Sequence, residues 1–185
     1  MGRLSLGRVV VVGASLAGIH AAQSVRRSGF DGDLIMIGDE AHYPYDRPPL
    51  SKEFLAGAIE VDRLRLRPAS DPAQLGIEWH LQHTATALTP DGVVTMQSPG
   101  GAVTSLHADG LVIATGTRPR TLPELDGLSG VHVLRSLDDA EALRAQLTHR
   151  GGPVVVIGFG FIGAEVAATA RQQGHSVTVV EMGQA

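Results

Sequence analysis

The chain has 185 residues, of which 43% are hydrophobic and 18% are charged, and its formal net charge is −4. This composition is typical of a globular protein with a sizeable core, and the acidic balance argues against nucleic acid or an anionic membrane as the main partner. The absence of cysteine excludes a disulfide framework, a thiolate metal site and a redox-active cysteine pair within these residues.

The N-terminal residues carry no recognisable targeting or membrane-spanning segment. The longest early apolar run, residues 9–12, is much shorter than a bilayer span and ends at Gly13. The eight histidines show no metal-ligand spacing such as HExxH. We therefore expect a cytoplasmic protein with no metal site and with neither a membrane nor a nucleic acid as its partner.

Residues 8–37 have the pattern of a β-α-β unit. "RVVVV" is a run of β-branched residues typical of a buried strand, "GASLAG" is a glycine turn, and an Ala-rich helix and the apolar strand "LIMI" follow. In the dinucleotide-binding pattern G-x-G-x-x-G, Ser15 replaces the middle glycine between Gly13 and Gly18. A serine hydroxyl can donate to a phosphate oxygen, so this turn still predicts a phosphate site.

The segment "YDRPPLSKEFLAG", residues 45–57, contains the only lysine of a chain that has fourteen arginines. Its two prolines stiffen the approach, and Ser51 is predicted to cap a helix that begins at Lys52. An ammonium group is a compact point charge, whereas a guanidinium is a broad planar fork. A lysine kept at this position suggests a role for a slim cation. The alternative is a solvated lysine in the first turn of a helix.

Residues 79–110 alternate short apolar runs with the turn signals "PDG" and "PGG". This pattern predicts a small antiparallel β-meander that leads into a buried strand, "LVIATG", residues 111–116. Prolines and glycines cluster over residues 117–130, where we place a domain junction. Residues 138–147 are predicted to form a helix that leads toward the last part of the chain.

Residues 153–181 repeat the pattern of residues 8–37. Glycines pair between the two copies at a constant offset of 145 residues: Gly13 with Gly158, Gly18 with Gly163, and Gly29 with Gly174. The second copy retains the full G-x-G-x-x-G, with Gly160 at its centre. It also follows a predicted strand and opens a predicted helix, which is the context that a dinucleotide site requires.

An acidic residue follows the second strand of each copy, where dinucleotide-binding folds place a ligand for the ribose hydroxyls. In the second copy this residue is Glu181, whose carboxylate would also repel a 2′-phosphate and so favours NADH over NADPH. The first copy has two extra loop residues, which puts Gly38 at the equivalent position. Asp39 is therefore the predicted ribose ligand, with Glu40 as the alternative.

These elements predict an α/β fold with two Rossmann-like FAD/NAD(P)-binding units, each with a parallel sheet, plus the small antiparallel β-meander. The second unit is expected to be truncated, because a nucleotide-binding unit needs more than one β-α-β. Two dinucleotide sites in one chain suggest hydride transfer between a tightly held flavin and an exchangeable nicotinamide. The residues alone leave open which site holds which cofactor.

Five motifs occur in one order over essentially the whole chain: "VVVGASLAG", "YPYDRPPLSKEFL", "LVIATGTRPR", "LRSLDDA" and "GFGFIGAEVAATA". Together they resemble the ferredoxin-reductase branch of the FAD-dependent pyridine-nucleotide oxidoreductases. The resemblance implies that residues 1–119 form the FAD-binding domain, and that residues 120–185 form a linker and an incomplete NAD-binding domain. It also implies a longer parent protein, so a cofactor-binding fragment without turnover is one alternative.

The resemblance implies the residues that contact each cofactor and the pair that takes part in catalysis. It implies FAD contacts at Gly13, Ser15, Leu16, Ala17, Gly18, Asp39, Arg47, Lys52, Ala85, Thr115, Gly116 and Arg135, and NADH contacts at Gly158, Gly160, Phe161, Ile162, Gly163 and Glu181. It also implies that Lys52 lies beside flavin N5 and pairs with Glu165. The first copy has His20 where the second has Glu165, so this acid is not part of the general repeat.

The function implied by the resemblance is that of a reductase in which NADH passes a hydride to FAD. Single electrons then go to a ferredoxin- or rubredoxin-type iron–sulfur protein that supplies an oxygenase. One alternative is an NADH-responsive flavoprotein sensor. Another is a disulfide or dehydroascorbate reductase, although the absence of a CxxxxC motif speaks against its disulfide form.

Overall fold

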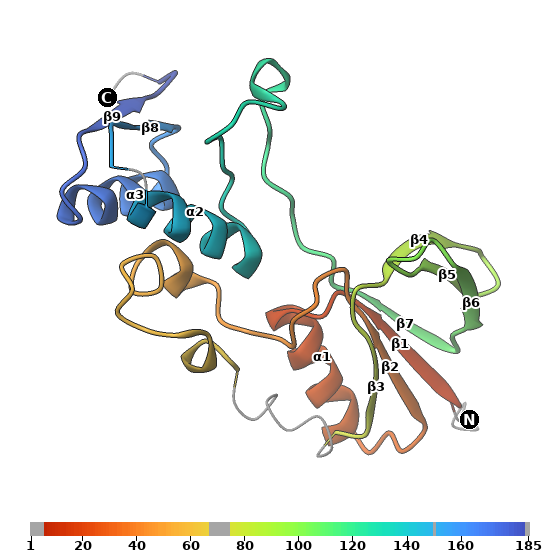
Figure 1. The fold of residues 1–185 in the computed structure, drawn as a ribbon. Helices are drawn as coiled ribbons and strands as arrows, with labels where there is room; N and C mark the ends of the chain where they lie inside the picture. Colours follow the sequence, from red (N-terminus) through yellow and green to blue (C-terminus); the bar gives the residue numbers. More distant parts are fainter. Residues whose placement is uncertain (1–5, 67–74, 150, 184–185) are drawn as a thin grey trace. The chain divides into compact units, whose positions relative to one another are not determined.

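The computed structural model describes residues 6–66, 75–149 and 151–183. The chain divides into two compact units, each described by itself below (Figure 1). The first unit comprises Met1–Tyr45 and Arg65–Thr117, and the second comprises Asp46–Leu64 and Arg118–Ala185. Contacts thus group residues 46–64 with the C-terminal part of the chain. The functional division into residues 1–119 and 120–185 stays a prediction.

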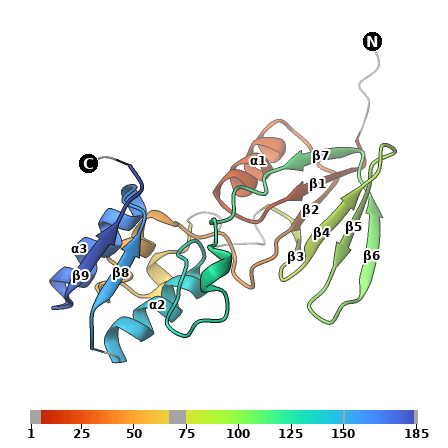
Figure 2. The same ribbon diagram turned by 90° about the horizontal axis from the view of Figure 1, so that it is seen from above.

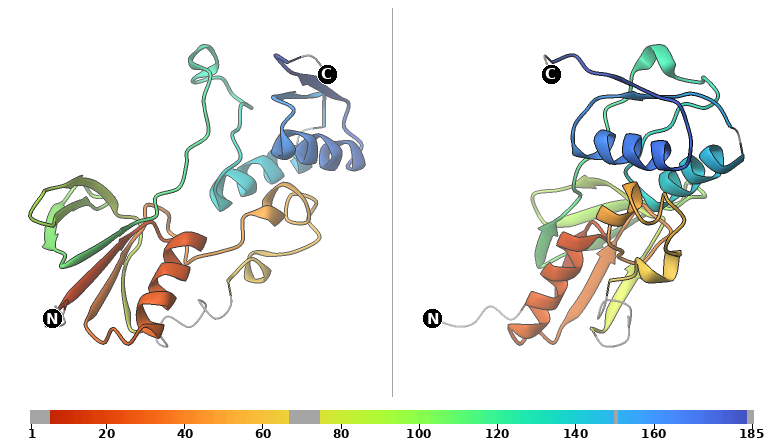
Figure 3. Two further views of the ribbon diagram at one scale, coloured as in Figure 1. Left: turned by 180° about the vertical axis from the view of Figure 1, so that it is seen from behind. Right: turned by 90° about the vertical axis from the view of Figure 1, so that its left-hand side faces the viewer.

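A four-stranded parallel sheet forms the centre of the first unit. It consists of β1 (Arg8–Val12), β2 (Asp33–Ile37), β3 (Ile77–His80) and β7 (Gly110–Ile113), in the order β3-β2-β1-β7. The helix α1 (Leu16–Arg27) connects β1 to β2 and lies along the sheet (Figure 1, Figure 3). A parallel strand that is covered on both faces needs a continuous apolar run, which explains "RVVVV".

Alternate residues of the central strands point to opposite faces of the sheet and enter two different cores. The face toward α1 buries Val9, Val11, Ile19, Ala22, Leu34, Met36 and Ile77. The other face buries Val10, Ile35, Ile37, Val94, Met96 and Ala108. Each fully buried Val, Leu, Ile or Met side chain in these cores stabilises the fold by roughly 1.5–3 kcal/mol, so the sheet is held from both sides.

The second face of the sheet is covered by the predicted antiparallel β-meander. Its strands β4 (Thr84–Leu88), β5 (Val93–Gln97) and β6 (Val103–His107) pair in the order β4-β5-β6. Figure 2 shows α1 and the meander on opposite sides of β1 and β7. The first unit therefore has three layers, namely a helix, a parallel sheet and a meander.

The start of the meander differs from the prediction. Residues 79 and 80 belong to β3, which pairs in parallel with β2, and the meander begins at Thr84. Trp79 packs against the core on the α1 side, and the Gly38 N–H donates to the His80 carbonyl at 3.0 Å. The alternating pattern of this stretch suits either kind of strand, so the partner decides the sheet to which it belongs.

Asp109 fixes the beginning of β1. Its Oδ2 accepts hydrogen bonds from the backbone N–H groups of Gly7 at 2.8 Å and Arg8 at 2.7 Å. The Arg8 N–H is the largest cause that lowers the Asp109 pKa below its usual value, and the Gly7 N–H is the next. The carboxylate is therefore favoured in the folded state over a wide range of pH.

We expect the stabilising contribution of Asp109 to the first unit to be lost in acid. Because its folded pKa is depressed, its contribution is present above the unfolded value of 3.8 and is lost as the pH falls through the folded pKa. Urea unfolding should show Asp109→Asn to be less stable than the wild type at about pH 7, with the difference shrinking at about pH 2. An equal difference at both values would contradict this role.

The second unit contains the other β-α-β copy. Strands β8 (Val154–Ile157) and β9 (Val177–Val180) are parallel neighbours joined through α3 (Phe161–Gln172). The predicted helix at 138–147 is confirmed as α2 (Leu137–His149). Leu55, Leu147, Val156, Val166, Ala167 and Ala170 form the buried core that these elements share. The predicted repeat is thus confirmed, since both copies form a parallel strand–helix–strand unit.

One face of the β8–β9 pair packs into that core and the other is exposed. Val155, Ile157 and Val180 are 59%, 56% and 50% exposed, whereas Val156 is buried. The alternation in β8 is the one expected for a strand that is covered on one side, whereas in β9 both Val179 and Val180 are exposed. Among the described residues, no helix has the length and apolar character needed to cross a bilayer.

Three short 3₁₀ helices complete the second unit: Pro48–Ser51, Val61–Arg63 and Pro123–Leu125. The first of them corrects the prediction of a helix that begins at Lys52. The Pro49 carbonyl accepts N–H groups from both Lys52 and Phe54 at 3.0 Å, so the chain continues in tight turns over residues 52–57. Two prolines at the start suit a short 3₁₀ helix, which needs few N–H donors in its first turn.

Candidate functional site

The glycine turn of the first unit depends on the absence of two side chains. Gly13 follows β1 with a φ of +116°, and a Cβ there would lie 2.1 Å from the Ala114 carbonyl oxygen. A Cβ at Gly18 would lie 1.9 Å from the Gly13 carbonyl oxygen. These two residues allow α1 to begin directly against the ends of β1 and β7, which brings the start of the helix close to the sheet edge.

The second unit reproduces this turn. Gly158 has a φ of +97° and its N–H donates to the Val180 carbonyl at 2.8 Å, as the Gly13 N–H does to the Ile37 carbonyl. A Cβ at Gly163 would lie 2.1 Å from the Gly158 carbonyl oxygen. Both copies therefore use the last glycine for the same close approach, whereas the first glycine is needed in both for its positive φ and is crowded only in the first copy, since a Cβ at Gly158 would meet nothing within 4 Å.

The middle position of the pattern is less demanding. Ser15 and Gly160 are the N-caps of α1 and α3, both extended, and neither helix has a side-chain capping hydrogen bond. A Cβ at Gly160 would meet nothing within 4 Å, so the turn accommodates a serine without distortion. The first N–H groups of a helix have no intrahelical partner, and with the helix dipole they favour an anion.

Glu181 lies over the second glycine turn. Its Oε2 accepts the Phe159 N–H at 2.5 Å, and its Oε1 accepts the N–H groups of Met182 and Gly183 at 2.8 and 3.2 Å. The Phe159 N–H is the largest cause that lowers the pKa of Glu181, followed by those of Gly183 and Met182. The structure thus places a carboxylate, favoured in its ionised form, against the backbone of the glycine turn.

In the second unit Glu181 directly follows β9. In the first unit Gly38 stands at the equivalent position after β2, so the acidic residues come one position later. A Cβ at Gly38 would lie 2.4 Å from the Ala14 Cβ, so the end of β2 touches the glycine turn at this point. Asp39 follows and is exposed, whereas Glu40 accepts the Tyr45 hydroxyl proton at 2.5 Å. Both acids therefore follow the end of β2, and the assignment of Asp39 as the ribose ligand, with Glu40 as the alternative, stays a prediction.

The second unit brings Lys52 and Glu165 together. The Lys52 Nζ lies 3.1 Å from Glu165 Oε1, and the side chains are 44% and 32% exposed. The Ser51 hydroxyl donates to the other carboxylate oxygen, Oε2, at 2.5 Å. The Ser51 hydrogen bond is the largest cause that lowers the Glu165 pKa, and Lys52 is the next. The result is an ion pair that can be reached from solvent and whose acid is kept ionised.

The family described as pyridine nucleotide-disulphide oxidoreductase matches the chain over residues 7–185. The chain belongs to this family. It is 40% identical to rhodocoxin reductase of Rhodococcus erythropolis, with 94% of this chain and 40% of that protein covered. It is 41% identical to putidaredoxin reductase of Pseudomonas putida, with 94% and 41% covered. The chain thus spans about two fifths of the length of these curated relatives.

A solved structure gives the same result for the fold. The crystal structure of the covalent putidaredoxin reductase–putidaredoxin complex aligns with a TM-score of 0.83 at 39% identity, and covers 94% of this chain and 42% of that chain. The predicted α/β fold with Rossmann-like units is thereby confirmed. The absence of cysteine from this family member means that its 185 residues supply no thiol for disulfide chemistry of their own.

Two arginines that the resemblance assigns to FAD also meet in the second unit. The Arg47 guanidinium donates to the Arg135 carbonyl at 2.6 Å. The Asp139 carboxylate accepts the N–H groups of Arg135 and Ser136, and the Ser136 hydroxyl accepts the Asp139 N–H, which fixes the start of α2. The main chain at Arg135 is therefore held from two sides, at its carbonyl and at its N–H.

The remaining predicted contacts lie where their motifs place them. Thr115 and Gly116 follow β7, and Ala85 lies in β4 and packs against the core of the first unit. At the helix starts, Leu16, Phe161 and Ile162 are 47%, 93% and 53% exposed. Large apolar side chains exposed beside a glycine turn suit a binding surface. The contacts of these residues with FAD or NADH stay predictions.

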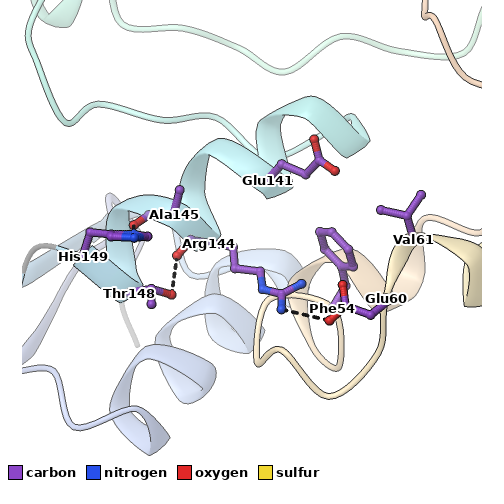
Figure 4. Close-up of a pocket in the computed structure, with 8 residues that line it drawn as sticks. All are labelled: Phe54, Glu60, Val61, Glu141, Arg144, Ala145, Thr148 and His149. Carbon is purple, nitrogen blue, oxygen red and sulfur yellow. Dashed lines mark hydrogen bonds and ion pairs between the residues drawn. The ribbon is translucent and has the colours of Figure 1, made fainter.

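The second unit also has a shallow pocket of about 380 Å³ away from its glycine turn, lined by Phe54, Glu60, Val61, Glu141, Arg144, Ala145, Thr148 and His149. Figure 4 shows the Arg144 guanidinium reaching Glu60, at 3.2 Å, beside the Phe54 ring. The described residues include no group of three potential metal ligands. The Arg144–Glu60 ion pair lies in the same unit as the Lys52–Glu165 pair but outside the predicted site, so the two can be compared.

Sequence reasoning missed three roles. Ser51 donates to Glu165 and does not cap a helix, and Thr169 donates to the Ser51 carbonyl at 3.1 Å. Tyr45 anchors Glu40. The first two had a signal in the sequence, because the two copies of the repeat differ at Glu165 and Thr169, where the first copy has His20 and Ser24. The pairing of Tyr45 with Glu40 had none.

Proposed function

We propose that the protein is an FAD-dependent NADH:ferredoxin-type reductase. The observation that carries this proposal is the duplicated glycine turn, with the ion pair of Lys52 and Glu165 added to the second copy only. A duplicated dinucleotide turn suits a flavin and a nicotinamide in one protein. Membership of the family supports the assignment of FAD and NADH as the two ligands.

The first turn is proposed to bind the ADP part of FAD. Gly13 and Gly18 let α1 begin directly against the sheet, and the start of α1 supplies N–H groups for the pyrophosphate. Asp39 would accept hydrogen bonds from the adenosine ribose. When bound, FAD supplies a carrier that takes two electrons from a nicotinamide and releases them one at a time.

Lys52 is proposed to stabilise negative charge on the reduced flavin. Glu165 holds the ammonium at 3.1 Å, and the Ser51 hydroxyl occupies the second oxygen of the same carboxylate. A positioned charge of this kind acts without reorganisation at the moment of reaction. An ammonium is also slimmer than a guanidinium and leaves space for a stacked nicotinamide.

The proposed electron acceptor is a ferredoxin- or rubredoxin-type iron–sulfur protein that supplies an oxygenase. The similarity to a putidaredoxin reductase solved in complex with putidaredoxin supports such a partner. A location in the cytoplasm, expected from the sequence, is part of the same proposal.

The visible absorption spectrum of the purified chain reconstituted with FAD tests this function. We expect flavin bands that bleach on anaerobic addition of NADH and recover when a ferredoxin is added as electron acceptor. Absence of bound flavin after reconstitution, or flavin that NADH does not reduce, would overturn the proposal for this chain.

The nicotinamide preference depends on Glu181. Its carboxylate lies at the second glycine turn and is held by the Phe159 N–H, so a 2′-phosphate would meet an ionised group. We expect Glu181→Ala to lower the ratio of the NADPH to the NADH dissociation constant by about tenfold, since two like charges about 4 Å apart repel by ~1 kcal/mol in water and by about 4 kcal/mol near a protein surface, and the variant removes this repulsion. Binding titrations with both nucleotides measure it, and an unchanged ratio would contradict the role.

A further inference from the structure

Three polar side chains of α3 and its C-cap lie on one face of the helix, four residues apart. They are Glu165, Thr169 and Gln173, and residues at this spacing stand one above the other. All three bond to one segment. Glu165 accepts the Ser51 hydroxyl, Thr169 donates to the Ser51 carbonyl at 3.1 Å, and Gln173 donates to the Leu55 carbonyl at 3.1 Å. We call these three residues the α3 seam.

The seam belongs to the second copy of the repeat alone. At the offset of 145 residues, the first copy has His20, Ser24 and Ser28. The Ser24 hydroxyl donates to the His20 carbonyl and the Ser28 hydroxyl to the Val25 carbonyl, both within their own helix region. A β-α-β unit therefore folds without such a seam, and its presence on α3 calls for a separate explanation.

The seam holds Ser51 by its side chain and its main chain together. Ser51 and Thr169 are 5% and 6% exposed, and buried hydroxyl groups of this kind need partners inside the protein. Lys52 is the next residue along the chain, so fixing the Ser51 carbonyl and hydroxyl fixes the point from which the lysine side chain starts.

Glu165 is held in the same way. One oxygen accepts from Ser51 and the other lies beside the Lys52 ammonium. Two donors on different oxygens define the plane of the carboxylate, whereas a lysine alone, with its flexible four-carbon stem, does not. The Ser51 hydrogen bond is the largest single cause that lowers the pKa of Glu165, which agrees with a short bond to the ionised acid.

We propose that Ser51 and Thr169 are positioning residues, which hold the Lys52–Glu165 pair in one geometry. Thr169 fixes the main chain at Ser51, and Ser51 orients the carboxylate that receives the lysine. The significance of this geometry for flavin reduction rests on the proposed function, but the positioning itself is a property of the second unit.

The single lysine makes a direct test possible. In the 185-residue chain, ¹³C labelling of lysine gives one side-chain spectrum, that of Lys52, and the Glu165 carboxyl signal is identified by its loss in Glu165→Gln. We expect Ser51→Ala to raise the Glu165 carboxyl pKa toward the ordinary glutamate value and to shift the Lys52 signal. Thr169→Val should produce a smaller change in the same direction, and the conservative variants Ser51→Thr and Thr169→Ser should restore the wild-type values.

Ser24→Ala is the matched control, because Ser24 is the repeat equivalent of Thr169 and the partners of its hydroxyl, the His20 carbonyl and the Arg27 guanidinium, both belong to its own helix. It should leave both signals unchanged. Unchanged Glu165 and Lys52 signals in Ser51→Ala, or a change of equal size in Ser24→Ala, would overturn the positioning roles.

Flavin reduction separates this inference from the proposed function. In the FAD-loaded protein, Ser51→Ala should lower the rate constant of reduction by NADH by roughly tenfold, with little change in the NADH concentration at half-saturation, because a misplaced group weakens the reaction more than binding. If the NMR signals change as expected and reduction keeps its wild-type rate, the positioning is upheld and the proposed role of Lys52 at the flavin is overturned.

Discussion

Replacing Gly13 with alanine is expected to destabilise the first unit severely. The new Cβ would lie 2.1 Å from the Ala114 carbonyl oxygen and 2.5 Å from its carbon. This neighbour is backbone at the end of β7, and the Ala114 N–H is bonded to the Val12 carbonyl at 2.7 Å, so it has no room to move aside. The φ of +116° adds about 1–3 kcal/mol of its own for a residue with a side chain.

These two penalties act together on a domain whose total stability is roughly 5–15 kcal/mol. We expect a loss of more than about 4 kcal/mol, which is exceptional for one methyl group. Thermal unfolding of the chain measures it, and reconstitution with FAD should give no flavin absorption, because the turn that is proposed to bind the pyrophosphate no longer forms.

Gly29→Ala is the matched control for the backbone penalty. Gly29 lies in the same unit with a φ of +88°, and a Cβ there would meet nothing within 4 Å. The control should therefore lose only about 1–2 kcal/mol. Similar stabilities for the two variants would show that the contact with Ala114 is not close, and would contradict the account of the turn.

The sequence predicts the repeat well because the physical causes are local. Runs of β-branched residues, the glycines of each turn and the Ala-rich helices all lie within about thirty residues, and each was found where the pattern placed it. The strand β3 was missed for the opposite reason. Its membership of the parallel sheet depends on pairing with β2, some forty residues away, and nothing in the "IEWH" stretch itself distinguishes the two kinds of strand.

The candidate site shows the same difference between features with local causes, which the sequence predicts, and features that depend on distant residues. The glycine turns and Glu181 follow from one short pattern, whereas Lys52 and Glu165 were connected only through the resemblance to a family. Ser51 illustrates the limit most clearly. By itself, a serine before a predicted helix is a good cap, but a carboxylate 114 residues away takes its hydroxyl in the fold. Comparison of the two copies marks the three seam positions as different, without saying what they contact.

Lys52→Ala is expected to slow reduction of the bound flavin by NADH on the order of a hundredfold, the usual effect of removing one positioned electrostatic group. The flavin content should stay close to that of the wild type, since the glycine turn and Asp39, proposed to hold the ADP part of FAD, are unchanged. Glu165 keeps its bond to Ser51 in this variant, so the second unit should retain its fold. Anaerobic stopped-flow absorbance measures the rate and the flavin content together.

Two further variants complete the test: one separates the charge of Lys52 from its shape, and the other is a control at a different ion pair. Lys52→Arg keeps the charge and replaces a compact ammonium by a planar fork, so an intermediate rate indicates that shape matters as well. Arg144→Ala removes a cation from the second ion pair of the same unit, 3.2 Å from Glu60, and should leave the rate unchanged. A wild-type rate in Lys52→Ala, or an equal fall in Arg144→Ala, would show that the single lysine of this chain has no special part in the reaction.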